Sequence, residues 1–205
     1  MFEFLFSHYK NYPNYEIGLE LTAILFGLLS VWYAKKDNIW VFPTGIINTA
    51  IYVFLLWKWN LLGDMMINFY YVVMSIYGWY HWTRKKDDVV EFPISKMNTY
   101  EKKVSLLVFV LTILFVVAVY RFFDKFTHWT TYVDTFVTGI FFVGMWLMAR
   151  RKIENWILWI IGDIISIPMY YDKGYSFTSI QYLIFTIIAV FGYLEWKKTL
   201  QQKIV

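Results

Sequence analysis

Seven stretches of this sequence are read as helices that cross a lipid bilayer, and the sixth of them, 156–171, is short. A membrane-spanning helix needs about 20 mostly apolar residues. Of the 205 residues, 59% are hydrophobic and 17% are charged, whereas a soluble domain averages about 25% charged residues. The sequence therefore predicts an all-α membrane protein that forms a single transmembrane domain over residues 1–205. Its seven helices are expected at 17–34, 39–57, 61–82, 104–123, 132–149, 156–171 and 175–196.

Basic residues are distributed unevenly between the two ends of the predicted helices. The connections at 35–38, 83–103 and 150–155, together with the residues after 196, hold 14 of the 19 lysines and arginines, and the other end holds 5. Because cytoplasmic loops carry the excess of lysine and arginine, the N-terminus is expected outside and the C-terminus in the cytoplasm. The basic residues form short clusters between apolar stretches, so they indicate a lipid bilayer as partner and not nucleic acid.

The two halves of the sequence repeat one another at a separation of 114–116 residues. The matching pairs are Ala34–Trp40 with Ala149–Trp156, Tyr77–Trp82 with Phe191–Trp196, and Glu20 with Asp134. A shift by four helices preserves chain direction, so the sequence predicts two parallel bundles of three helices, 17–82 and 132–196. Helix 104–123 is the linker in this 3+1+3 arrangement. Repeats with a binding site at their interface are a transporter architecture.

An acidic residue lies near the middle of the sixth apolar stretch. Burying an ionisable group at that depth costs about 2.5–3.5 kcal/mol on insertion scales, so such a group indicates a functional site. It belongs to a stripe with spacings i, i+3, i+7, i+10 and i+14, which places all five side chains on one face of a helix. The stripe consists of Trp156, Trp159, Asp163, Ser166 and Tyr170.

Further polar and aromatic side chains lie on the predicted helices 39–57, 61–82 and 175–196. They are Trp40, Asn48 and Tyr52, then Asp64, Asn68 and Tyr71, and finally Gln181. We expect them to converge with the Asp163 stripe on one chamber near the middle of the membrane. Tryptophan and tyrosine faces stack flat rings and attract cations, and amides both donate and accept hydrogen bonds. The predicted ligand is therefore a small aromatic solute, neutral to cationic and rich in hydroxyls.

Each of these polar groups also has a purely structural interpretation. Asn48 and Asn68 could hydrogen-bond only between helices, and Asp163 could pair with a backbone group or a tyrosine hydroxyl. Glu20 and Asp134 lie close to the outer boundary, where they either shape an entrance or are simply solvated.

Several chemistries are excluded by what the sequence lacks. It contains no cysteine, so disulfides and thiolate catalysis are absent. The three histidines share no helix face, and no metal site is expected. No HExxH, GxSxG or phosphate-binding glycine loop occurs. We therefore expect neither a catalytic residue nor a cofactor, and the chain is not predicted to be an enzyme.

Three segments resemble signatures of the PnuC vitamin transporters: Asn38–Asn48, Tyr77–Trp82 and Glu154–Trp159. The resemblance implies a seven-helix 3+1+3 fold similar to full-length SWEET transporters, a homotrimer and a place in the bacterial inner membrane. It implies transport of nicotinamide riboside by facilitated diffusion, with trapping by a cytoplasmic kinase; some subgroups of the family carry thiamine or riboflavin. The substrate contacts implied in this way are Asn48, Asn68, Trp156, Trp159 and Gln181.

Two residues depart from the family pattern. Asn68 lies where the resemblance leads us to expect glutamine, and Asp163 where it leads us to expect asparagine. The additional negative charge suits a cation, and since thiamine and nicotinamide riboside are both cations, thiamine is a real alternative. A proton-coupled vitamin transporter that uses Asp163 as the proton carrier is a second alternative, and a membrane-embedded enzyme is a third.

Overall fold

The computed structural model describes residues 13–59, 62–86, 89–124, 126, 128–172 and 176–202. Within these ranges the chain forms seven helices and one short antiparallel hairpin, which confirms the all-α prediction. The helices are α2 (Asn14–Lys35), α3 (Val41–Lys58), α4 (Leu62–Thr83), α5 (Thr99–Phe122), α6 (Trp129–Ala149), α7 (Glu154–Asp172) and α8 (Ser176–Gln202). Strands β1 (Lys85–Lys86) and β2 (Val89–Val90) pair after α4. The predicted helix starts at 61 and 175 lie outside the described residues.

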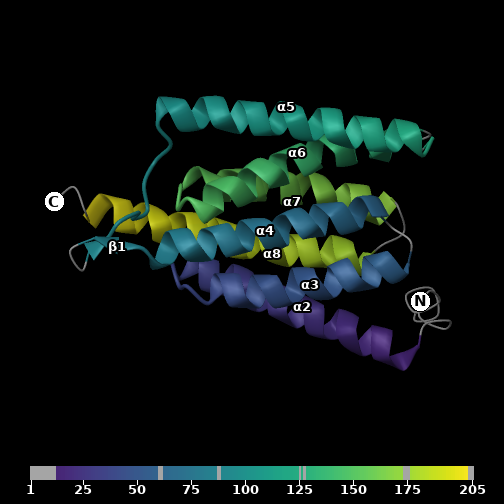
Figure 1. The fold of residues 1–205 in the computed structure, drawn as a ribbon, viewed down its shortest axis with the longest axis horizontal. Coiled ribbons are helices and arrows are strands. Elements are labelled where there is room, and N and C mark those ends of the chain that lie inside the picture. Colours follow the sequence, from purple (N-terminus) through teal and green to yellow (C-terminus); the bar gives the residue numbers. More distant parts are fainter. Residues whose placement is uncertain are drawn as a thin grey trace.

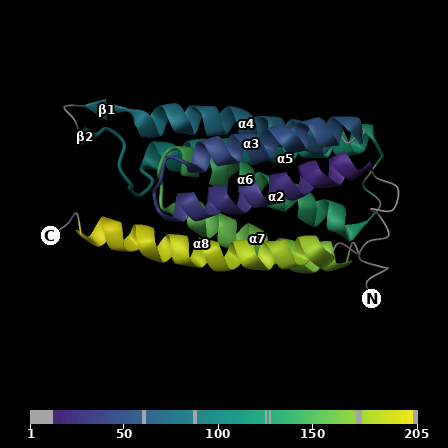
Figure 2. The same ribbon diagram turned by 90° about the horizontal axis from the view of Figure 1, so that it is seen from below.

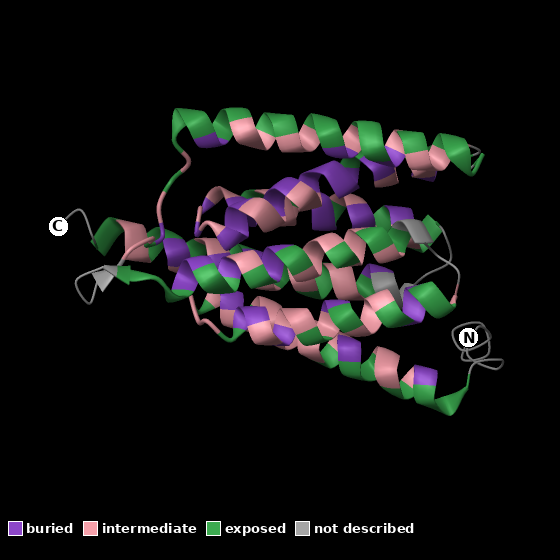
Figure 3. Cartoon of the chain, viewed as in Figure 1, coloured by how far each residue is buried: buried purple, intermediate pink, exposed green. Residues whose placement is uncertain are grey.

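The helices run side by side along the long axis of the molecule (Figure 1). Five of them, α2, α3, α5, α6 and residues Ser179–Gln202 of α8, are long and apolar enough to cross a membrane. The other two, α4 and α7, lie parallel to these five and carry the intramembrane polar residues that lower their hydropathy. Exposed apolar side chains such as Leu107 and Leu114 cover α5, where a bilayer would lie, and buried residues gather on the inner helices (Figure 3).

The helices pack as two triplets and a linker. Helix α3 packs between α2 and α4, and α7 packs between α6 and α8. The triplets meet where α2 contacts α8 and where α4 contacts α6, and α5 lies along α6 (Figures 1 and 2). The first helix of each triplet thus contacts the third helix of the other, which is the pattern that a two-fold axis between two copies produces.

The turns after the first helix of each triplet have the same conformation. Asp37 has a φ of 50° and Arg151 a φ of 53°, both in the left-handed region. The backbone hydrogen bonds around them match at a constant offset of 114 residues: Asp37 to Ala34 and Asn38 to Tyr33, against Arg151 to Met148 and Lys152 to Leu147. In this register Phe42 corresponds to Trp156. The predicted alignment of Trp40 with Trp156, two residues out of this register, is therefore corrected.

Four buried aromatic residues close the end of the bundle at which the α2–α3 and α6–α7 turns lie. We call Phe42, Trp82, Trp156 and Trp196 the inner plug. The rings of Phe42 and Trp82 meet edge to face at 4.9 Å, and those of Trp156 and Trp196 do the same at 5.5 Å. Trp82 and Trp196, which are 114 residues apart, approach within 6.0 Å. The plug therefore repeats the two-fold relation of the helices.

Glycines at equivalent positions make room for the inner plug. A Cβ atom added at Gly78 would lie 2.3 Å from Cε1 of Phe42, and one added at Gly192 would lie 2.7 Å from Cη2 of Trp156. Since real Cβ contacts are never that short, the ring would have to move. The close approach of these helices depends on the absence of a side chain at both positions.

Substituting Gly192 by alanine is expected to destabilise the protein by about 1–3 kcal/mol, because overpacking forces the Trp156 ring out of its position. Gly18→Ala is the matched control, since nothing lies within 4 Å of a Cβ at that helical position. Alanine there is expected to be neutral or to stabilise by about 0.5–1 kcal/mol. Thermal unfolding in detergent micelles checks both variants, and equal melting temperatures would contradict the close packing at Gly192.

Candidate functional site

Asp163 on α7 lies deep inside the bundle, and its side chain is 3% exposed. It lies within electrostatic range of Tyr71 on α4 and Tyr182 on α8, so both triplets contribute to its surroundings. Among the residues that the structure describes, no hydrogen bond or ion pair reaches its carboxylate. The structural interpretation, in which Asp163 pairs with a backbone group or a tyrosine hydroxyl, thus has no support within the described part of the chain.

A row of stacked aromatic rings from three helices lies beside Asp163. Tyr170 stacks on Tyr182 at 5.1 Å, and the rings of Tyr182 and Phe141 are parallel at 6.1 Å. Phe141 in turn stacks on Trp159 at 5.2 Å. Together with Asp163 and Tyr71 these residues form what we call the Asp163 cluster: Tyr71, Phe141, Trp159, Asp163, Tyr170 and Tyr182. Its rings pack against one another, so a flat ligand would bind by separating them.

Besides Nε1 of Trp156 in the inner plug, two buried polar atoms on the same face of α7 have no hydrogen-bond partner among the described residues. They are Nε1 of Trp159 and Oγ of Ser166, and the Ser166 side chain is fully buried. Leaving a buried donor or acceptor unsatisfied costs about 1–3 kcal/mol. A polar solute at the Asp163 cluster could recover this free energy by bonding to either atom.

The contact between the triplets extends the aromatic wall. Tyr70 on α4 donates its hydroxyl to the carbonyl of Phe142 on α6 at 3.0 Å, and the two rings stack at 4.0 Å. Tyr71 lies 6.0 Å from the same Phe142 ring. Tyr71 therefore lies beside α6, at the interface between the two triplets.

The two asparagines of the first triplet donate to backbone carbonyls. Nδ2 of Asn48 donates to Ala23 on α2 at 2.6 Å, and Nδ2 of Asn68 donates to Asp64 one turn earlier at 3.0 Å. Asn48 therefore joins α3 to α2 by a hydrogen bond between helices, which is the structural role considered for it above. Asn68 remains half-buried on α4.

The second triplet has an equivalent helix contact in which the small and the large residue have exchanged helices. Asn48 of α3 fills the space beside Gly27 of α2, whereas Phe141 of α6 fills the space beside Gly162 of α7. These pairs correspond at the offset of 114. Because Gly162 has no side chain, α7 cannot make at this position the side-chain hydrogen bond that Asn48 of α3 makes to α2. The Phe141 ring fills the space instead and becomes part of the Asp163 cluster.

Two of the other predicted site residues lie outside the cluster. Trp40 precedes α3 and is 57% exposed, and Trp156 is fully buried in the inner plug. Asp64 is exposed in the first turn of α4, while Tyr52 and Gln181 are half-buried on α3 and α8. Among the predicted site residues, the contacts described above bring Tyr71, Trp159, Asp163 and Tyr170 together.

The two acids predicted at an outer entrance have different surroundings. Asp134 on α6 accepts a hydrogen bond from the hydroxyl of Tyr120 on the linker helix α5, so its carboxylate faces the linker. Glu20 is half-buried on α2. The sequence analysis missed Glu16, which is 5% exposed and accepts from Lys58 Nζ and Trp59 Nε1, each at 2.9 Å. This network joins α2 to α3 at the end of the bundle opposite the inner plug.

Phe141 and Tyr182 were also missed by the sequence analysis. Phe141 lies within a uniformly apolar stretch, where it does not differ from its neighbours. Tyr182 lies next to Gln181, on a different face of the same helix. The offset of 114 is the signal that could have found Tyr182, because it aligns this residue with Asn68.

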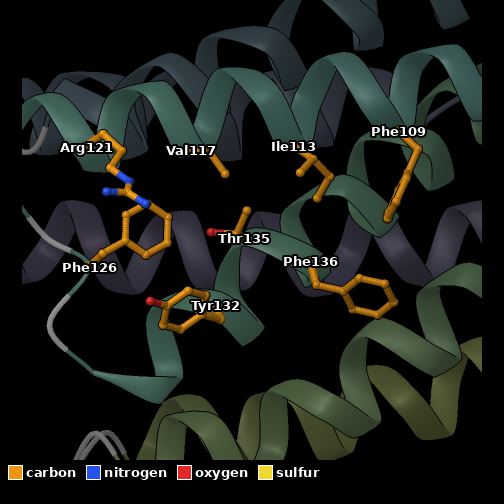
Figure 4. A pocket seen from close by; sticks show the side chains of 8 residues that line it. All are labelled: Phe109, Ile113, Val117, Arg121, Phe126, Tyr132, Thr135 and Phe136. Atoms are coloured by element: carbon orange, nitrogen blue, oxygen red, sulfur yellow. The ribbon is translucent and has the colours of Figure 1, made fainter.

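A hollow of about 350 Å³ lies between α5 and α6. Its lining is almost entirely apolar, and its one charged side chain, Arg121, stacks over Phe126 at 5.5 Å (Figure 4). It belongs to the side of the bundle covered by the linker helix, and none of its lining residues belongs to the Asp163 cluster. No group of three metal-ligating side chains occurs within the described ranges.

Comparison with known proteins identifies the family. Residues 17–198 match the model of the nicotinamide mononucleotide transporter. The chain belongs to the nicotinamide mononucleotide transporter family. It is similar to the nicotinamide riboside transporter PnuC of Escherichia coli (strain K12), with 24% identity over 90% of this chain and 87% of that one. It is also similar to the riboflavin/roseoflavin transporter RibM of Streptomyces davaonensis, with 21% identity over the same shares.

A crystal structure of the vitamin B3 transporter PnuC has the same fold. Its TM-score against this chain is 0.67 at 20% identity, covering 90% of this chain and 82% of that one. The resemblance to PnuC seen in the sequence is thereby confirmed. As a member of the nicotinamide mononucleotide transporter family, this protein is a multi-pass membrane vitamin transporter and not an enzyme.

Proposed function

We propose that the protein carries nicotinamide riboside across the bacterial inner membrane by facilitated diffusion, and that phosphorylation in the cytoplasm traps the transported riboside there. The observation that carries this proposal is the buried Asp163 carboxylate beside a row of stacked aromatic rings. A buried charge is costly unless an opposite charge compensates it. Nicotinamide riboside supplies a positively charged flat ring, which aromatic faces attract by about 0.5–2 kcal/mol per contact.

The ribose and the carboxamide of this substrate need hydrogen-bond partners. Nε1 of Trp159 and Oγ of Ser166 are buried without a partner among the described residues. Both lie on the face of α7 that carries Asp163, so one bound molecule could reach all three. In this assignment Asp163 balances the ring charge, Trp159 and Phe141 separate and stack on the two faces of the ring, and Ser166 binds a hydroxyl.

Transport requires the two triplets to rock about the Asp163 cluster. With the C-terminus in the cytoplasm, the inner plug is the barrier on the cytoplasmic side. The polar contacts that join the triplets there include a hydrogen bond from Trp196 Nε1 to the Ala34 carbonyl at 3.1 Å and an ion pair between Lys35 and Glu195 at 3.3 Å. The opening movement would break these contacts and expose the cluster to the cytoplasm.

Arg151 adds a third connection at this end. It forms an ion pair with Asp37 at 3.0 Å and covers the ring of Trp82 at 4.2 Å. Burial lowers the pKa of its guanidinium, and the neighbouring Asp37 offsets part of that shift. The residue therefore couples the α6–α7 turn of one triplet to the α2–α3 turn of the other.

Two other substrates fit the same site. Thiamine is also a cation with flat rings, so Asp163 favours it equally. Riboflavin is neutral, and the similarity of this chain to the riboflavin/roseoflavin transporter RibM supports it as a substrate. A proton-coupled mechanism would use Asp163 as the carrier, and a pH gradient alone would then drive accumulation.

Uptake into proteoliposomes tests the proposal. Labelled nicotinamide riboside should equilibrate across the membrane without ATP or an ion gradient, and the recovered solute should be chemically unchanged. Thiamine and riboflavin are measured in parallel. Failure to transport any of the three would contradict the proposed function, and accumulation that follows an imposed pH gradient would replace facilitated diffusion by proton coupling.

We also propose a homotrimer, which the resemblance to PnuC supports. The mass of the protein in detergent, measured by light scattering with the detergent subtracted, should be three times that of the 24.8 kDa chain. A monomeric mass at all protein concentrations would contradict it.

A further inference from the structure

A second hollow, of about 210 Å³, lies at the end of the bundle assigned to the cytoplasm. The end of α4, the segment after β2 and the turn between α6 and α7 form its walls. The side chains that matter here are His81, Glu91, Phe92, Ser95, Arg150 and Lys152. A water molecule takes about 30 Å³ of liquid, so this volume accommodates a solute of several heavy atoms.

The walls of this hollow are held in place before any ligand binds. The backbone N–H of Ser95 donates to the carbonyl of Arg151 at 3.1 Å, and that of Ile153 donates to the carbonyl of Ser95 at 3.0 Å. Phe92 stacks on His81 at 3.8 Å, which fixes the segment to α4. A ligand would therefore meet a preformed site.

Positive charge exceeds negative charge around the hollow. Arg150 and Lys152 share one carboxylate oxygen, Oε1 of Glu101, at 3.2 and 3.0 Å. Glu91, which also lines the hollow, is neutralised by Arg84 at 2.8 Å. Arg150 and Lys152 thus share the single negative charge of Glu101, and a net positive charge of one remains for an anion to balance.

Hydrogen-bond donors remain available as well. Arg150 bonds to Glu101 and to the hydroxyl of Tyr77, and Lys152 bonds to Glu101 and to Ser95. A guanidinium and an ammonium carry more N–H donors than these contacts use. In addition, His81 is 7% exposed, and its Nδ1 is buried with no hydrogen-bond partner in the described ranges.

We propose that this hollow binds a phosphate group on the cytoplasmic face of the transporter. Arg150 and Lys152 supply the charge-assisted hydrogen bonds that phosphate oxygens favour, and Ser95 and His81 supply neutral partners. The site is separate from the Asp163 cluster and does not depend on which vitamin is carried. The phosphate belongs either to a free phosphate or soluble monoester, or to the headgroup of an anionic lipid.

Calorimetric titration of the purified full chain with inorganic phosphate tests the site, in neutral detergent at constant ionic strength. Saturable binding is expected in the wild type. Lys152→Gln should raise the Kd about tenfold or more, because it removes a charge-assisted hydrogen bond. Lys198→Gln is the matched control: it removes an exposed cation on α8 near the same end of the bundle, its side chain does not line the hollow, and its Kd should equal that of the wild type.

The melting temperature of each variant shows whether it is folded. Since Lys152 also contacts Glu101, Ser95→Ala provides a milder variant that leaves both cations in place, and it should raise the Kd about threefold or more. No phosphate binding by the wild type, or unchanged affinity in both folded variants, would overturn the proposal.

The source of the phosphate is distinguished in nanodiscs. If a lipid headgroup occupies the site, phosphatidate in the nanodisc should abolish the binding of inorganic phosphate that is seen with phosphatidylcholine alone. If the ligand is soluble, both lipid compositions should give the same affinity. Loss of binding in both compositions would overturn the site.

Discussion

Replacing Asp163 by asparagine is expected to weaken the binding of nicotinamide riboside by about tenfold or more, which corresponds to about 1.4 kcal/mol. Asparagine has nearly the shape of aspartate, so the packing of the Asp163 cluster should persist while the negative charge is lost. In a site of low dielectric constant, this charge acts strongly on a cationic ring. Thiamine should lose affinity to a similar degree, and neutral riboflavin should lose less than about threefold.

Equilibrium binding to the purified protein measures this difference. Asp172→Asn is the matched control, because it makes the same change on the same helix at an exposed position. It should leave all three affinities unchanged. An equal loss for cationic and neutral vitamins in Asp163→Asn would show that Asp163 acts on packing and not on ligand charge.

Replacing Glu101 by glutamine is expected to lower the free energy of unfolding by about 2–3 kcal/mol. Glu101 is 1% exposed, and its Oε1 is the shared partner of Arg150 and Lys152. Removing one partner of a fully buried ion pair costs about 3–5 kcal/mol. The expected loss is smaller here because the side chains of Arg150 and Lys152 are 28% and 14% exposed, so water can solvate them in part.

Glutamine keeps an acceptor for the N-terminal cap of α5, in which the Asn98 N–H donates to Glu101 Oε2 at 2.9 Å. The variant therefore isolates the charge. Glu91→Gln breaks a pair in which Arg84 is 47% exposed, and such a pair is worth about 0–1 kcal/mol. Chemical denaturation in mixed micelles compares the two variants, and equal losses would contradict a special role for the buried carboxylate.

The fold was largely predictable because the bilayer imposes a strong requirement on helix length and composition. The 3+1+3 order followed from the echo of Tyr77–Trp82 in Phe191–Trp196. The exact alignment of the two repeats did not follow from the sequence. The tryptophans at 40 and 156 suggested an offset of 116 residues, whereas the matching turn conformations at Asp37 and Arg151 give an offset of 114. Equivalence is decided by backbone conformation, which short sequence matches locate only within a few residues.

The candidate site was predictable in part. The stripe through Asp163 identified Trp159 and Tyr170, because helical periodicity fixes which residues share a face. It also included Trp156, which the structure places in the inner plug. Helical periodicity does not tell which neighbouring helix covers each part of a face. That depends on where small residues let a large ring approach, as Gly162 does for Phe141 and Gly192 for Trp156.

The basic connections had a second role that charge counting does not reveal. Arg150 and Lys152 were used only to orient the chain, yet both contact the buried Glu101. Glu101 precedes the predicted linker helix at 104–123 and was read as part of a polar loop. A sequence pattern shows where charged residues cluster along the chain. The pairing of Arg150 with Glu101, which are 49 residues apart, is seen only in the folded structure.

A vitamin is expected to bind by stacking in the Asp163 cluster, and tryptophan fluorescence tests this claim most directly. Titration with nicotinamide riboside should quench the fluorescence saturably, and the quench should be largely lost in Trp159→Phe, because Trp159 lines the cluster whereas Trp156 is sealed in the inner plug. Trp129→Phe, at an exposed position, should quench like the wild type. A full quench in Trp159→Phe with unchanged affinity would contradict the claim.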